Sequence, residues 1–60
     1  MQYDIAYFAQ GKQVHHESIE FLSLADAKRH ACETVCGLRS KYDVRFVSLY
    51  DGETTHEMNI

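Results

Sequence analysis

The fold of this 60-residue chain is decided by residues 21–31, which read FLSLADAKRHA. An alternating pattern typical of a strand stops here, and a helix is predicted to begin. Ser23 suits the start of a helix, because its hydroxyl can accept a hydrogen bond from a free N–H of the first turn. Asp26 follows three residues later, where a carboxylate favours the positive end of the helix dipole. We therefore expect one helix in the middle of the chain, beginning after Ser23.

The expected helix has a single apolar stripe. At 100° per residue the following side chains share one side: Leu24, Ala27, Ala31, Val35 and Leu38. The alanines at the centre of this stripe have little bulk, so the helix can lie close to a sheet. Gly37 is predicted to end the helix as a left-handed cap, after about 13 residues.

Two strand pairs are predicted around the helix. Before it, residues 3–8 form one strand, Gly11 allows a turn, and residues 13–22 form the next. A bulge near residues 17–18 would bring all the apolar side chains of this second strand to the core. After the helix, residues 43–50 are rich in β-branched and bulky side chains.

The last strand is predicted from a turn signal. Asp51-Gly52 favours a hairpin, and residues 54–60 would return from it as an edge strand. The predicted class is α+β, with a four-stranded antiparallel sheet and one helix packed on one face, in the order ββαββ. Sixty residues make one small domain, residues 1–60.

Composition and termini indicate where the protein works. Cys32 and Cys36 are the only cysteines, and we interpret them as reduced thiols of a cytosolic protein. The first residues, MQYD, lack the basic start of a signal peptide. No apolar run approaches the roughly 20 residues that cross a bilayer. We therefore expect a cytoplasmic protein without membrane association.

No catalytic centre, metal site or cofactor is predicted, and we expect the protein not to be an enzyme. The cysteines do not lie at a helix N-terminus, where the pKa of a thiol falls. His15 and His16 are adjacent on a predicted strand and point to opposite faces, so they cannot chelate one ion together. A structural zinc would need four ligands, and no such set is spaced for it.

Charge and aromatic content instead indicate binding. The net charge is −3, whereas a dedicated nucleic-acid binder is expected to be basic. Residues 28–45 nevertheless carry five basic against two acidic side chains, a net charge of +3. Seven aromatic residues are more than one small core needs, so some are expected on the sheet face that the helix leaves open. Eight residues are predicted to bind a partner: Tyr3 and Tyr7 as aromatic anchors, Arg39, Lys41 and Arg45 as a cationic loop, and Asp51, Glu53 and Glu57 as an acidic hairpin.

Residues 22–31, LSLADAKRHA, resemble a segment of small phage and mobile-element proteins of ββαβ or ββαββ form. Some of these are anti-CRISPR inhibitors, in which a strand pair leads into a helix opening Ser-Leu-x-x-Ala-Lys-Arg. The resemblance covers these ten residues and the order of the elements. It implies a phage protein in a bacterial host cell that binds an immune ribonucleoprotein stoichiometrically and masks its DNA path. The contact residues of those inhibitors are not matched in this chain.

Two alternatives stay open at this point. The first is a weak nucleic-acid-binding protein that stacks bases on the tyrosines of the open face, with an affinity that falls steeply with salt. The second is a homodimer whose open sheet face pairs with itself. The leading hypothesis is a small protein-binding module that docks on a larger protein or ribonucleoprotein complex.

Overall fold

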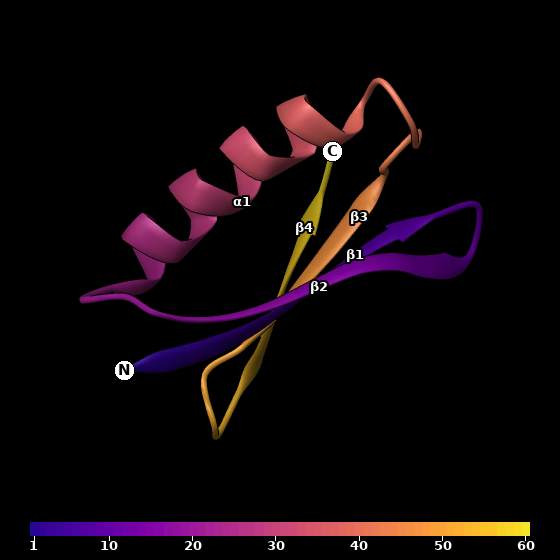
Figure 1. Ribbon diagram of the computed structural model, residues 1–60. Coiled ribbons are helices and arrows are strands. Elements are labelled where there is room, and N and C mark those ends of the chain that lie inside the picture. Colours follow the sequence, from indigo (N-terminus) through magenta and orange to yellow (C-terminus); the bar gives the residue numbers. More distant parts are fainter.

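The computed structural model describes residues 1–60 and shows the predicted α+β architecture (Figure 1). Its five elements are β1 (Gln2–Ala9), β2 (Lys12–Glu20), α1 (Leu24–Leu38), β3 (Phe46–Tyr50) and β4 (Thr55–Asn59). The four strands form one antiparallel sheet in the order β2-β1-β3-β4. The predicted edge position of the last strand is therefore confirmed, and β2 forms the other edge.

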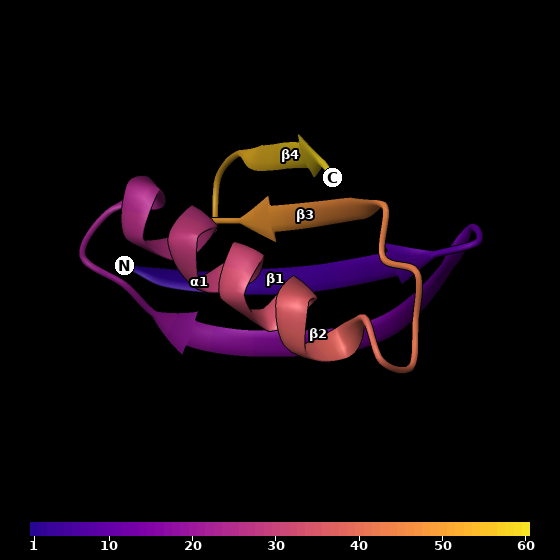
Figure 2. The same ribbon diagram turned by 90° about the horizontal axis from the view of Figure 1, so that it is seen from above.

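The helix lies on one side of the sheet and leaves the other side open (Figure 1). Seen from above, α1 runs obliquely across the sheet, and β4 lies beside the helix and is not covered by it (Figure 2). No helix of the chain is both long and apolar enough to cross a membrane.

The turn between β1 and β2 and the start of the helix both form as the sequence predicts. Gln10 and Gly11 both have positive φ, 54° and 76°, as a two-residue hairpin turn of the primed type requires. At the helix start, the Ser23 hydroxyl accepts a hydrogen bond from the Asp26 N–H at 3.2 Å. This bond satisfies one of the free donors of the first turn.

The predicted end of the helix at Gly37 is wrong, because α1 continues through this residue to Leu38. The chain leaves the helix in a right-handed conformation at Arg39, whose N–H donates to the Val35 carbonyl at 3.1 Å. The N–H groups of residues 41 and 42 both donate to the Leu38 carbonyl, at 2.9 and 2.8 Å. These bonds satisfy the carbonyls of Val35 and Leu38, and the helix ends without a left-handed residue.

Replacing Gly37 by alanine should raise the free energy of unfolding by about 0.5–1 kcal/mol, because glycine inside a helix costs backbone entropy. A Cβ atom at this position would meet no atom within 4 Å. Urea denaturation measures the change. Gly52→Ala is the matched control: its Cβ also has open space, but its φ of +100° strains any other residue, so this variant should be destabilised. Equal effects of the two substitutions would contradict the interpretation.

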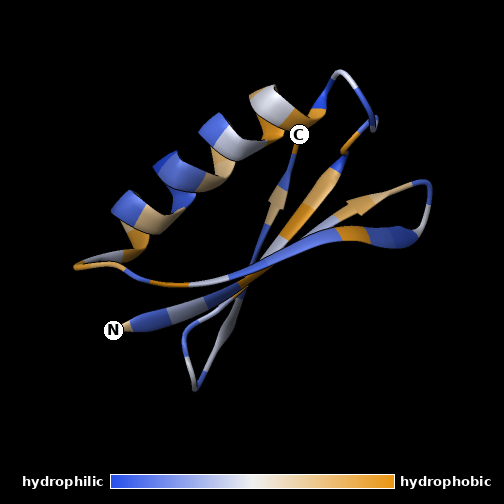
Figure 3. Cartoon of the chain, in the orientation of Figure 1, coloured by the Kyte–Doolittle hydropathy of each residue, from blue (hydrophilic) through white to orange (hydrophobic).

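The core lies between α1 and the helix-facing side of the sheet. Nine buried side chains form it: Tyr3, Ile5, Tyr7, Ala27, Ala31, Val35, Val44, Val47 and Leu49. Hydrophilic and hydrophobic segments alternate along α1 in Figure 3, as expected for a helix with one buried stripe. Both alanines at the centre of the stripe are fully buried, so the helix backbone lies close to the sheet.

The bulge of β2 lies at a different place from the one predicted. Tyr7 pairs with His15, but Phe8 pairs with Gln13, so Val14 is the extra residue. The prediction of a bulge near residues 17–18 is therefore wrong. The reason is that Ile19, opposite Tyr3, already points to the helix-facing side of the sheet. Only Val14 needs a bulge to reach that side. The bulge turns Val14 toward the core, where it packs against the buried cluster.

Candidate binding surfaces

Tyr3 and Tyr7 do not lie on the open sheet face, so their predicted placement is wrong. Tyr3 is 3% exposed and Tyr7 is 0% exposed, and both belong to the core beneath α1. They share the strand parity of Ile5, and side chains two residues apart on a strand point to the same face. Phe8 is an odd number of residues away from these three, so its side chain points to the opposite, open face.

The open face instead carries an aromatic pair near one end of its two central strands. Phe8 of β1 and Phe46 of β3 are direct partners on the two central strands. Their rings are tilted by 59° with centroids 5.7 Å apart, a favourable aromatic geometry. Both side chains are half-buried. We call Phe8 and Phe46 the phenylalanine pair.

Polar side chains lie on the same face toward the other end of the strands. The Gln2 side-chain amide donates to the Ser18 hydroxyl at 2.6 Å, and this hydroxyl donates to the Asp4 carboxylate at 2.8 Å. Glu57 of β4 lies opposite Ser48 and is exposed on the same face. The open face therefore has an apolar pair at one end and polar, partly acidic side chains at the other.

The predicted cationic residues are brought together by the structure. Arg39, Lys41 and Arg45 line one hollow of about 520 Å³ between the end of α1 and the start of β3. Four other residues complete its wall: Tyr42, Asp43, Val44 and Ile60. Ile60 reaches the site because its N–H donates to the Arg45 carbonyl at 2.9 Å. We call this site the cationic hollow.

The predicted acidic residues do not act as one group. Asp51 is engaged within its own turn, where its Oδ1 accepts hydrogen bonds from the Glu53 N–H at 2.9 Å and the Thr54 N–H at 2.7 Å. Its Oδ2 lies 3.1 Å from His56 Nε2. The two backbone N–H groups, followed by His56, lower the pKa of Asp51 to about 2. Asp51 thus holds the four-residue hairpin loop, whereas Glu53 is exposed at its tip.

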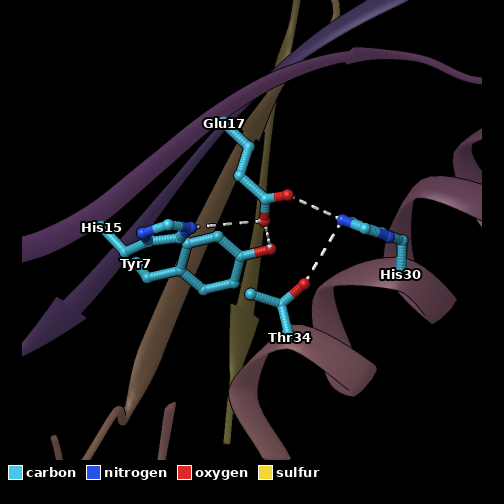
Figure 4. A network of polar contacts seen from close by, with 5 residues as sticks. All are labelled: Tyr7, His15, Glu17, His30 and Thr34. Carbon is cyan, nitrogen blue, oxygen red and sulfur yellow. Dashed lines mark hydrogen bonds and ion pairs between the residues drawn. The ribbon is translucent and has the colours of Figure 1, made fainter. Parts of the chain in front are cut away.

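A cluster of polar side chains lies between α1 and β2, and sequence reasoning missed it (Figure 4). The Tyr7 hydroxyl donates to Glu17 Oε1 at 2.7 Å, and His30 Nε2 lies 2.8 Å from Glu17 Oε2. Thr34 Oγ1 lies 3.3 Å from the same His30 nitrogen. His15 Nε2 approaches Glu17 Oε1 to 3.9 Å. The sequence does contain a signal for this cluster: Glu17 lies two residues before Ile19 on β2, so its side chain points to the same, apolar side of the strand.

The electrostatics of this cluster follow from burial and hydrogen bonding. Burial raises the pKa of Tyr7 well above its ordinary value, and the adjacent Glu17 carboxylate adds to the rise. Partial burial acts to raise the pKa of Glu17, but hydrogen bonds from His30 and Tyr7 outweigh it, so this pKa lies below its ordinary value. Both Glu17 oxygens are occupied, and the hollow of the molecule lies elsewhere. The cluster therefore fastens the helix to the edge strand.

The remaining residues with reactive or ligating side chains are dispersed. Cys32 and Cys36 are free and exposed on α1. No three histidine, cysteine or acidic side chains are grouped so that they could hold a metal ion. The phenylalanine pair and the cationic hollow are the two candidate binding surfaces of the chain.

Both surfaces lie at the same end of the sheet, since Phe8 accepts a backbone hydrogen bond from Arg45 at 3.1 Å.

Comparisons with models of protein families, with curated proteins and with solved structures find no significant match to this chain.

Proposed function

We propose that the chain is a non-enzymatic binding module that docks through its open sheet face on a larger protein or ribonucleoprotein complex. The observation that carries the proposal is the phenylalanine pair on the face that no helix covers. Interfaces owe most of their binding energy to a few buried aromatic or charged anchors that a polar margin shields from water. The phenylalanine pair has such polar neighbours, because exposed Gln13 lies opposite Phe8 and exposed Asn59 lies opposite Phe46 on the two edge strands.

The rigidity of the pair favours docking. Phe8 and Phe46 lie on the two central strands, each hydrogen-bonded to a neighbour on both sides. Their rings also contact each other, so little side-chain freedom remains to be lost when a partner covers them. Anchors that are already ordered lower the entropic cost of association.

The kind of partner is proposed from the resemblance of residues 22–31 to anti-CRISPR inhibitors. On this proposal the module acts by competition, because it occupies a surface of a bacterial complex along which nucleic acid would otherwise pass. Glu53 and Glu57 are exposed and could face the basic channel of such a complex. Asp51 is left out of this set, because its carboxylate is engaged in the hairpin turn.

Replacing both Phe8 and Phe46 by serine should reduce capture of the partner from bacterial lysate by about tenfold or more, since aromatic anchors carry hot-spot energies. The tagged protein is used with and without nuclease, bound species are identified by mass spectrometry, and circular dichroism verifies the fold. Leu22→Ser is the matched control, because Leu22 is an apolar side chain that is 95% exposed and lies between β2 and α1. A nuclease-resistant partner whose capture survives the double substitution would contradict docking through this face.

A specific observation also favours nucleic acid as a second candidate. Aromatic side chains on adjacent strands can stack successive bases of a single strand, and the phenylalanine pair has this placement. Capture that depends on the pair and disappears with nuclease would favour this candidate. A homodimer that buries the pair would be seen by light scattering and would replace both readings.

A further inference from the structure

We propose that the cationic hollow is a binding site for the phosphate group of a nucleotide, with the nucleoside resting on its aromatic wall. This inference goes beyond the docking function, because the hollow and the phenylalanine pair are separate surfaces. The volume of the hollow, about 520 Å³, lies within the roughly 300–1,000 Å³ that small-molecule sites occupy. Three of its lining side chains are cationic and one is a carboxylate, which gives an excess of two positive side-chain charges.

The arginine nearest the sheet is oriented by an exposed ion pair. Arg45 Nε and Nη2 both lie 3.0 Å from Asp43 Oδ2. A guanidinium has five N–H donors in a fixed plane, so this contact orients the group and leaves the Nη1 donors free. Arginine in this state matches the paired oxygens of a phosphate. Arg39 and Lys41 make no ion pair within the chain, and their charges are available to the same ligand.

Hydrogen bonds neutralise part of the negative potential at the end of α1. The carbonyl groups of a last turn carry partial negative charge. The Leu38 carbonyl accepts two backbone hydrogen bonds, and the Val35 carbonyl accepts one from Arg39. These contacts satisfy two of the last four carbonyls, and the cationic side chains of the hollow outweigh the partial negative charge that remains.

The apolar part of the wall distinguishes a nucleotide from a bare phosphate ion. Tyr42 is 39% exposed although it lines the hollow, and Ile60 is exposed to the same extent. Val44 is buried and closes the wall from within. A tyrosine ring beside cationic groups can stack on a base while the cations hold its phosphate. Inorganic phosphate would contact only the cationic side chains of this site and not its apolar wall.

The negative charge of the whole chain does not prevent this binding. The hollow lies at the Phe46 end of β3, whereas the acidic hairpin loop follows Tyr50 at the other end. The molecule is 29 Å long, and charges are screened over about 8 Å at physiological ionic strength. A phosphate at one end is therefore governed mainly by the local cations.

The test is a nuclear magnetic resonance titration of the whole 15N-labelled chain with four probes: adenosine monophosphate, inorganic phosphate, a single-stranded DNA hexanucleotide and hexaglutamate. Adenosine monophosphate should shift the amide signals of residues 39–45 and 60 and bind more tightly than inorganic phosphate. The double variant Arg39→Gln/Lys41→Gln should weaken this binding by about tenfold or more, and added salt should weaken it further. The control Lys28→Gln/Arg29→Gln removes the same charge from α1 outside the hollow and should change the affinity by less than about twofold.

The outcomes separate the sources of the phosphate and the two functions. Tighter binding of the hexanucleotide identifies a nucleic-acid strand as the source, and equal binding identifies a free nucleotide; both support the site. The Phe8→Ser/Phe46→Ser variant should retain nucleotide binding even where it loses docking, so that each proposal can fail alone. Absence of shifts at residues 39–45, equal losses in the two charge variants, or hexaglutamate binding as tight as that of the nucleotide would overturn the proposal.

Discussion

Replacing Glu17 by leucine should lower the free energy of unfolding by about 2 kcal/mol, because the buried Tyr7 hydroxyl would lose its acceptor. Glu17 is the common partner of Tyr7 and His30, at 2.7 and 2.8 Å, and its side chain is only 16% exposed. In a domain of this size the melting temperature should fall by about 10 °C. Thermal unfolding followed by circular dichroism measures the change.

A second variant and a control show whether the lost hydrogen bond is the cause. Tyr7→Phe removes the hydroxyl, so the double variant Tyr7→Phe/Glu17→Leu should be more stable than the sum of the two single losses predicts. Glu20→Leu changes an exposed carboxylate on the same strand and should leave stability within about 0.5 kcal/mol. Additive losses, or an equally stable Glu17→Leu variant, would show that the cluster does not fasten α1 to β2.

The same substitution should change the response to acid. The pKa of Glu17 is lowered in the folded chain, so the unfolded state binds a proton first as the pH falls. The stabilisation is therefore complete above the unfolded carboxyl pKa of about 4.3 and is lost as the pH falls through the lower folded value. Asp51, with its pKa of about 2, contributes in the same direction and remains in the variant. Glu17→Leu should accordingly keep only part of the acid dependence.

Replacing Ala31 by leucine should lower the free energy of unfolding by about 3 kcal/mol. Ala31 is fully buried in the stripe where α1 lies against the sheet, and the only hollow lies at the end of the helix. A larger side chain would force the helix away from the sheet. Since about 3–9 kcal/mol is the whole stability expected for 60 residues, this loss would remove about a third of the stability or more.

Ala25→Leu provides the control, because Ala25 is exposed on the same helix. Leucine is nearly as good a helix former as alanine, so this variant should unfold within about 0.5 kcal/mol of the parent chain. Urea denaturation of both variants measures the difference. Similar losses at the two positions would mean that helix propensity, and not the close approach to the sheet, decides the outcome.

Features set by neighbouring residues could be predicted from the sequence. The start of the helix after Ser23, its buried stripe and the turn at Gly11 each depend on a few adjacent side chains, and the structure confirms them. Gly37 misled because the end of a helix is also decided by later residues, here the N–H groups of residues 41 and 42.

The binding surfaces were less predictable, since they depend on which strand face meets the helix. In the first strand both parities carry an aromatic side chain, so the pattern alone did not separate Tyr7 from Phe8. The cationic residues were predicted from composition, but the hollow they line is a tertiary feature. It needs Ile60 beside Arg45, at the end of a strand pairing that local sequence does not encode.

The order of the strands has a consequence for how the chain folds. β1 and β2 are joined by two residues and β3 and β4 by four, so each hairpin closes a short loop and can form within microseconds. The pairing of β1 with β3 joins residues 4–8 to residues 46–50 and must close a long loop across the helix, which is slower. Phe8 and Phe46 come into contact through this slower β1–β3 pairing. The proposed docking surface therefore forms only when β1 and β3 pair. A partly folded chain that lacks this pairing is not expected to bind the partner.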